Sequence, residues 1–151
     1  MSTEGIKMKI DSEQNLRFKI LERIRSKSDM AILRSDLADL ASPRQLTRAL
    51  QKLVEENVLV RLGYGIYGRL FFSRYTNNYC LDGFIVGIGR EVLNKLNIAW
   101  RPSQFEEDYN NGRSKQIPVN PTTRIIGRFN RRIQYEDIQF QYEAYSKQKT
   151  A

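Results

Sequence analysis

The chain has 151 residues, of which 40% are hydrophobic and 28% are charged, enough for one domain or two small ones with packed cores. It has no histidine and one cysteine, Cys80, which excludes histidine-based triads, histidine zinc sites and an intramolecular disulfide. The net charge of +8 favours a polyanionic partner, and charge alone does not distinguish DNA, RNA and a membrane surface. We expect a cytoplasmic protein, because no apolar run approaches the roughly 20 residues of a membrane span and a single cysteine suits a reducing compartment.

The N-terminal part of the sequence predicts two helices separated by a short strand. The first ten residues are polar, and we expect them to fray. Asp11 or Ser12 then caps a helix that runs to about Lys27, with apolar residues at helical spacing. Residues 30–33 suit a very short strand, after which Ser35 is placed to cap a second, short helix.

The third helix carries the clearest local signals in the chain. Ser42 is placed as its N-cap, Pro43 suits the first helical position, and Gln45 completes a capping box. Asn57 suits the left-handed position that ends a helix. Five apolar residues follow the i, i+3, i+4, i+7, i+8 pattern of a buried helix face: Leu46, Ala49, Leu50, Leu53 and Val54.

A tight hairpin is expected directly after this helix. Val58, Val60 and Leu62 alternate as in a strand, residues 63–65 turn the chain, and residues 66–72 return. Two short helices, a longer one and a hairpin stand in the order of a winged helix-turn-helix. We therefore expect residues 11–72 to form a winged helix-turn-helix DNA-binding domain.

The second half of the chain predicts a small α+β domain over residues 82–143. Residues 73–82 are polar and aperiodic, which suits a domain boundary. A helix is expected from about 84 to 96, and a short one from Pro102 to Asn110. From Gln116 onward the apolar pattern has period two, which indicates a small antiparallel sheet. The predicted fold class is therefore α+β, with a winged helix followed by two helices and this sheet.

The outward face of the third helix favours DNA recognition. Arg44, Arg48 and Gln51 lie on one line, and arginine and glutamine suit the major-groove edges of guanine and adenine. The alternative is an ordinary solvated helix face. In the hairpin, Tyr64 suits either a minor groove or a plain exposed turn. The predicted DNA-binding residues are Ser42, Arg44, Gln45, Thr47, Arg48, Gln51 and Lys52 in the helix and Arg61, Tyr64 and Arg69 in the wing.

Other candidate sites are weaker. Gly63, Gly65 and Gly68 spell a glycine-rich motif, but a strand-like segment follows them where a dinucleotide site needs a helix. The acidic run 106–108 sits in one helix, where adjacent carboxylates point in different directions, so we expect neither a metal site nor catalysis nor any cofactor. A second basic cluster suits either an added nucleic-acid surface or the outer face of strands: Arg124, Arg128, Arg131 and Arg132.

Several of these segments resemble the N-terminal domain of the AbiEi-like type IV antitoxins. The resemblance rests on residues 33–40, on 44–50 and most specifically on 61–67, Arg-Leu-Gly-Tyr-Gly-Ile-Tyr. It is good over about residues 16–70 and weaker through 109–119 into the basic strands ending at Glu143. It implies an operon autorepressor that counters a nucleotidyltransferase toxin, usually without a tight complex. The chain is shorter than larger members of that family, which carry a fuller C-terminal antitoxin domain.

The expected function is therefore sequence-specific binding of double-stranded DNA by an antitoxin and autorepressor. In the family the winged helix carries DNA binding, which maps here onto Arg44, Gln45, Thr47, Arg48 and the wing. We expect an operator with an inverted repeat and a homodimer to read it. The alternatives are a protein-interaction module on a winged-helix scaffold and a stand-alone transcriptional regulator without a toxin.

Overall fold

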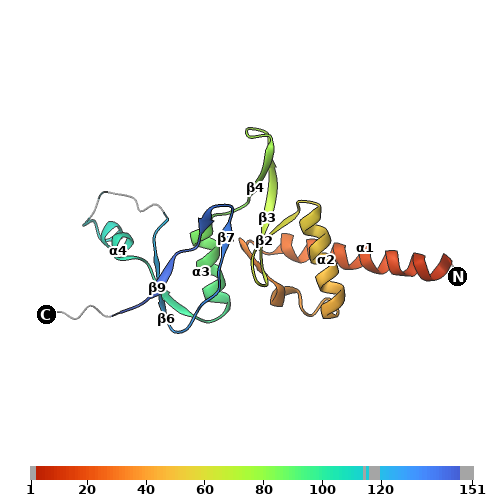
Figure 1. The fold of residues 1–151 in the computed structure, drawn as a ribbon, viewed down its shortest axis with the longest axis horizontal. Coiled ribbons are helices and arrows are strands. Elements are labelled where there is room, and N and C mark those ends of the chain that lie inside the picture. Colours follow the sequence, from red (N-terminus) through yellow and green to blue (C-terminus); the bar gives the residue numbers. More distant parts are fainter. Residues whose placement is uncertain (1–2, 114, 116–119, 147–151) are drawn as a thin grey trace. The chain divides into compact units, whose positions relative to one another are not determined.

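The protein is an α+β structure built from two compact units. The computed structural model describes residues 3–113, 115 and 120–146, with side chains from residue 11 onward. Unit 1 comprises the chain up to residue 61 and residues 65–82, and unit 2 comprises residues 62–64 and the chain from residue 83 (Figure 1).

Unit 1 begins with a longer helix than the sequence predicts. Helix α1 spans Thr3–Ser26, so Asp11 and Ser12 lie inside the helix and do not cap it. Strand β1, Ala31–Leu33, follows as predicted. The expected second helix is a single 3-10 turn, η1, over Arg34–Leu37, with Leu33 rather than Ser35 at its N-cap. The Asp36 carboxylate accepts a hydrogen bond from the Leu33 N–H at 3.1 Å, which fixes the start of this turn.

Helix α2, Pro43–Glu55, forms as its capping signals predict. The Ser42 hydroxyl accepts a hydrogen bond from the Gln45 N–H at 3.3 Å, and the Gln45 side chain accepts one from the Ser42 N–H, also at 3.3 Å. These reciprocal bonds satisfy two backbone donors at the helix start. Asn57 has a positive φ of 59° and ends the helix in the left-handed conformation.

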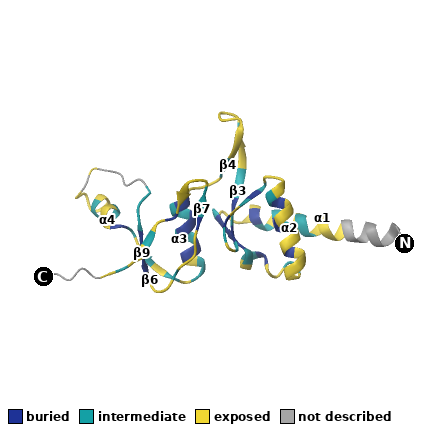
Figure 2. Cartoon of the chain, in the orientation of Figure 1, coloured by how far each residue is buried: buried dark blue, intermediate teal, exposed yellow. Residues whose placement is uncertain are grey.

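The core of unit 1 lies between α1, η1, α2 and the sheet. Ile20 and Ile24 of α1 meet the apolar side of α2, whose buried residues lie along one side of the helix (Figure 2). Tyr67 of the hairpin is partly buried and packs against this cluster. The cluster consists of Ile20, Ile24, Ile32, Leu37, Leu46, Leu50, Leu53 and Leu59.

The sheet of unit 1 contains one strand that the sequence pattern does not predict. Strands β2, Leu59–Gly63, and β3, Ile66–Ser73, form the expected hairpin, and the strand order is β1-β3-β2. Residues 73–82, expected to be an aperiodic boundary, contain strand β4, Asn78–Leu81, which pairs antiparallel with β3. The strand pattern misses β4 because it is only four residues long and follows the polar residues 73–77.

Unit 2 begins with helix α3, Ile85–Lys95, close to the predicted limits. Strand β5, Ala99–Arg101, follows and includes the only tryptophan, Trp100. Helix α4, Gln104–Asn110, starts after Ser103, so Pro102 precedes the cap instead of opening the helix. Ser103 and Glu106 form a second capping box, with the Ser103 N–H donating to the Glu106 carboxylate at 2.7 Å.

The strands of unit 2 do not form the purely antiparallel sheet that the sequence predicts. Strands β6, Thr123–Ile126, and β9, Tyr142–Ala144, pair in parallel, while β5 pairs antiparallel with β6. A separate two-stranded ladder joins β7, Gln134–Tyr135, and β8, Ile138–Gln139. The alternation predicted over Gln116–Val119 lies outside the described residues.

Phe140 is the centre of the unit 2 core. Its side chain is 1% exposed and lies against Gly89 of α3, where an added Cβ would sit 2.4–2.5 Å from three ring carbons. Such an approach is shorter than any non-bonded carbon contact, so only glycine fits here. Ile88, Val92 and Leu93 of α3 and Ile125 and Ile133 of the strand region are also buried in this unit.

A half-buried ion pair joins α3 to α4. The Arg90 guanidinium donates two hydrogen bonds to the Glu106 carboxylate, at 2.8 and 2.7 Å, and a third to the Thr123 hydroxyl at 3.0 Å. It also lies 4.7 Å from the centre of the Trp100 ring. Burial acts to raise the pKa of Glu106, but the bonds from Arg90 and Ser103 outweigh it and hold that pKa below 4.5.

We expect unit 2 to lose part of its stability in acid through Glu106. Because its folded pKa lies below the unfolded value, the stabilisation is present above pH 4.5 and is lost as the pH falls through the lowered folded value. Urea unfolding followed by Trp100 fluorescence measures this unit. The variant Glu106→Gln is expected to have a lower midpoint at pH 6 and a smaller fall in acid. Asp137→Asn, at an exposed carboxylate of the same unit, should leave the profile as in the wild type. Equal acid slopes for Glu106→Gln and wild type would refute the role of Glu106.

Candidate nucleic-acid interface

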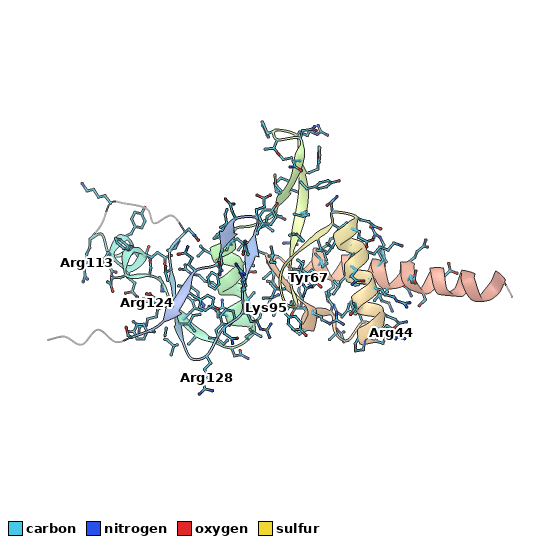
Figure 3. All side chains as sticks on the ribbon, in the orientation of Figure 1. Arg44, Tyr67, Lys95, Arg113, Arg124 and Arg128 are labelled. Atoms are coloured by element: carbon cyan, nitrogen blue, oxygen red, sulfur yellow. The ribbon has the colours of Figure 1, made fainter. Side chains whose placement is uncertain are left out.

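The outward face of α2 carries a line of exposed cationic and amide side chains. Arg44, Arg48, Gln51 and Lys52 are all exposed, and Arg44 projects from α2 in Figure 3. Within the described part of the chain, none of these four side chains makes a hydrogen bond or ion pair. Their charged and amide groups therefore face solvent and are available to an external polyanion.

Two other predicted residues of α2 are already engaged within the helix. The Gln45 side-chain oxygen accepts the capping-box bond from the Ser42 N–H and a further bond from the Ser42 hydroxyl at 3.1 Å. The Thr47 hydroxyl donates to the Pro43 carbonyl at 2.9 Å. Ser42, Gln45 and Thr47 thus fix the geometry of the helix start, and recognition by Gln45 would require its amide nitrogen.

Arg34, which no sequence pattern singles out, holds the hairpin turn beside the start of α2. Its backbone N–H donates to the Gly65 carbonyl at 2.9 Å, and its guanidinium donates to the Pro43 carbonyl at 2.7 Å. Gly65 has a positive φ of 68°, a conformation that favours glycine. Nothing local in the sequence reveals this link, because its partners lie well beyond the neighbouring residues of Arg34.

The remaining wing residues differ in how they are used. Tyr64 immediately precedes Gly65 and is 81% exposed, so its ring is not part of a core. Arg61 is exposed on β2. Both placements agree with side chains that can reach a ligand, whereas the third predicted wing residue, Arg69, is bound internally.

Arg69 joins the end of α1 to the sheet. Its guanidinium donates to the carbonyls of Ile24, Lys27 and Asp29, at 3.2, 3.3 and 2.8 Å, and its Nε lies 3.8 Å from the Asp82 carboxylate. A cation at a helix C-terminus satisfies carbonyls that lack helical partners and complements the helix dipole. These bonds give Arg69 a structural role within unit 1, while its predicted phosphate contact stays a prediction.

We expect Arg69→Met to destabilise unit 1 by about 1–2 kcal/mol, because charge-assisted bonds to helix carbonyls are lost. Methionine keeps much of the apolar stem, so the change tests the guanidinium. Urea unfolding followed by far-ultraviolet circular dichroism measures the effect. Arg61→Met, a matched change on β2, is expected to cost less. A loss of DNA affinity in Arg69→Met without loss of stability would contradict the structural role.

A cleft of about 520 Å³ runs between α1 and α2 beside the outward face. Leu16 and Ala49 contribute apolar surface, and Arg17, Arg48 and Lys52 supply positive charge. Arg17 also forms an ion pair with Glu56, just beyond the end of α2. The cleft adds cationic surface next to the line of Arg44, Arg48 and Gln51. It is lined by Ser12, Glu13, Gln14, Leu16, Arg17, Gln45, Arg48, Ala49 and Lys52.

The second basic cluster, in unit 2, is only partly exposed. Arg124 lies in β6, where its Nε donates to the Pro102 carbonyl at 2.8 Å and its Nη2 lies 2.8 Å from the Glu107 carboxylate. Arg128, Arg131 and Arg132 are exposed beyond β6 (Figure 3 labels Arg124 and Arg128). Arg124 therefore has a structural role, and three of the four arginines remain on the surface.

The acidic run of α4 is used within unit 2. Glu106 pairs with Arg90 and Glu107 with Arg124, so these carboxylates hold α4 in place. Across the described residues, no group of three or more histidine, cysteine or acidic side chains is arranged to hold a metal ion.

No helix among the described residues is long and apolar enough to cross a membrane. Comparison with protein-family models, with curated proteins and with solved structures found no match.

Proposed function

We propose that unit 1 is a winged helix-turn-helix domain that binds double-stranded DNA in a sequence-specific manner. The observation that carries the proposal is the exposed face of α2, where Arg44, Arg48, Gln51 and Lys52 have no partner among the described residues. The order of α1, β1, η1, α2 and the β2–β3 hairpin supports it. Arg34 adds support, because it holds Gly65 of the hairpin next to Pro43 at the start of α2.

In this proposal α2 enters the major groove with its N-terminal half toward the bases. Arg44 and Arg48 donate to guanine O6 and N7, and Gln51 suits adenine N6 and N7. Lys52, one turn farther from the helix start than Arg48, contacts phosphates together with Arg61. Tyr64 sits at the turn of the hairpin that flanks this helix, where it reaches the neighbouring minor groove or backbone.

The resemblance to AbiEi-like antitoxins extends this proposal to a biological role. The chain then represses its own operon and counters a nucleotidyltransferase toxin encoded beside it. Residues 61–67 and 44–50 carry the resemblance, and they coincide with the hairpin and with α2. Co-expression with the neighbouring nucleotidyltransferase tests this role. Growth that the chain does not rescue would leave DNA binding without an antitoxin function.

Binding to duplex DNA at increasing salt tests the DNA proposal directly. Because Lys and Arg side chains displace condensed counterions, affinity is expected to fall by orders of magnitude between about 50 and 200 mM salt. Fluorescence anisotropy with a labelled operator, selected from random duplexes, measures this slope. An unselected duplex of equal length is the control for specificity. Absence of binding at low salt would refute the proposal and favour a protein-interaction module.

A further inference from the structure

The β3–β4 hairpin of unit 1 is a second surface that the proposed DNA contact does not use. We define the β3–β4 arm as residues 70–81. Figure 1 shows the arm extending from the helices of unit 1. Four aromatic side chains of the arm lie in solvent: Phe71 at 49%, Phe72 at 51%, Tyr75 at 101% and Tyr79 at 41% exposure. Phe72 and Tyr79 face each other on one side of the arm and Phe71 lies on the other side, because neighbouring strand residues alternate between faces. So many exposed aromatic residues on a short hairpin mark an interaction site.

The arm lies at the opposite end of β3 from the proposed DNA-reading end. Strand β3 begins directly after Gly65, which Arg34 holds beside the start of α2, and it ends at Ser73. Eight strand residues at about 3.3 Å each separate the two ends by roughly 26 Å. The arm also carries a single charged residue, Arg74. The aromatic surface therefore suits a protein partner better than the DNA that α2 would read.

Strand β4 presents an unprotected sheet edge. In the described part of the chain β4 pairs only with β3. The Asp82 N–H donates to the Arg69 carbonyl at 2.8 Å, so the backbone groups of Asp82 face β3. Because alternate residues of an antiparallel strand direct their backbone groups to the same side, those of Cys80 face β3 as well. The backbone groups of Tyr79 and Leu81 then face outward. Residues 78–81 contain no lysine, proline or charge, the devices that usually protect an edge from pairing.

We propose that β4 pairs antiparallel with β4 of a second copy of this chain, about a two-fold axis at Cys80. A two-fold axis perpendicular to a sheet places one residue directly opposite its own copy. With Cys80 at the axis, Tyr79 of each copy exchanges both backbone hydrogen bonds with Leu81 of the other. With Tyr79 at the axis, Leu81 would have to pair with Asn77, whose positive φ of 54° takes it out of the strand.

The exposed aromatic area and the charges of the arm are consistent with pairing to a second copy of the chain. Aromatic side chains each bury about 150–250 Å², so the exposed parts of these four in two copies can supply at most on the order of 1,000 Å², near the lower bound of a specific interface. Phe72 and Tyr79 already pack edge to face at 5.4 Å, which extends one aromatic surface across the pair. Antiparallel pairing also directs Arg74, at the tip of one arm, toward the end of β4 where Asp82 of the other copy lies.

The oligomeric state of the full chain tests the proposal first. Sedimentation velocity of the wild type is expected to give twice the 17.7 kDa chain mass. Tyr79→Arg places a charge on the edge and is expected to abolish the dimer. Phe18→Arg, at another exposed aromatic residue of unit 1, is the matched control and is expected to stay dimeric. Circular dichroism checks that both variants are folded. A monomeric wild type, or a dimer that Tyr79→Arg leaves intact, overturns the proposal.

Disulfide cross-linking tests the register without depending on an arm variant that folds. Opposed residues that do not exchange backbone bonds have Cα atoms about 4.5 Å apart, within the range for a disulfide. Mild oxidation of the wild type is expected to give a dimer on a non-reducing gel, and Cys80→Ser is expected to give none. In the Cys80→Ser background, Asn78→Cys mixed with Asp82→Cys is expected to cross-link faster than either alone. A wild type that forms no cross-link overturns the pairing. A monomeric wild type whose Tyr79→Arg variant loses DNA affinity also overturns it, because the arm would then contact DNA and not a second copy.

Discussion

Replacing both Arg44 and Arg48 by alanine is expected to lower affinity for the selected operator on the order of 100-fold or more. Each arginine is exposed on the outward face of α2 without a partner among the described residues. A bidentate arginine–guanine contact contributes about 1–3 kcal/mol of discrimination. Because neither side chain packs in the core, thermal stability should stay close to that of the wild type. Fluorescence anisotropy at one fixed salt concentration measures the loss.

Two further variants separate base recognition from general charge. Lys52→Ala is expected to weaken binding evenly across sequences and to reduce the salt slope by about one unit. Arg113→Ala, at an exposed arginine of unit 2 outside the second basic cluster, removes the same charge and is expected to leave affinity unchanged. If Arg113→Ala weakens binding as much as Lys52→Ala does, the outward face of α2 is not the reading surface.

The elements that could be predicted are those whose signals are local. Ser42, Pro43 and Gln45 define the start of α2 within four residues, and the apolar spacing fixes its buried side, so the whole helix follows from sequence. The β2–β3 hairpin follows from its glycine-containing turn. The exposed side chains on the outward face of α2 could be predicted for the same reason, because the position of the buried side of a helix determines which side chains point outward.

The features that could not be predicted come from partners that are distant in sequence. The sequence pattern predicts that Arg69 binds phosphate, but the carbonyls that it meets lie at least 40 residues earlier, at and beyond the end of α1. Arg124 is likewise held by Pro102 and Glu107. Side-chain type alone cannot distinguish an arginine on a strand that faces solvent from one that meets a helix end. The parallel pairing of β6 with β9 is not predicted because period-two alternation does not specify strand direction.

Gly89→Ala is expected to destabilise unit 2 by about 1–2 kcal/mol, although alanine is the better helix former. Helix propensity alone favours alanine over glycine by about 1 kcal/mol. At Gly89, however, the added Cβ would lie 2.4–2.5 Å from three ring carbons of Phe140, whose side chain is buried. Steric overlap in a packed core costs more than the propensity gains. Urea unfolding followed by Trp100 fluorescence measures the net change in the free energy of unfolding, which combines the steric cost and the propensity gain.

A double-mutant cycle with Phe140→Leu isolates the cause of this cost. Leucine removes the planar ring that meets the new methyl group, so Gly89→Ala is expected to cost less in the Phe140→Leu background than in the wild type. The contribution of unit 1 to the far-ultraviolet circular dichroism spectrum should not change, because both residues belong to unit 2. A higher urea midpoint for Gly89→Ala would mean that Phe140 does not pack against α3 at this glycine. An equal cost in both backgrounds would instead assign the destabilisation to the backbone of α3.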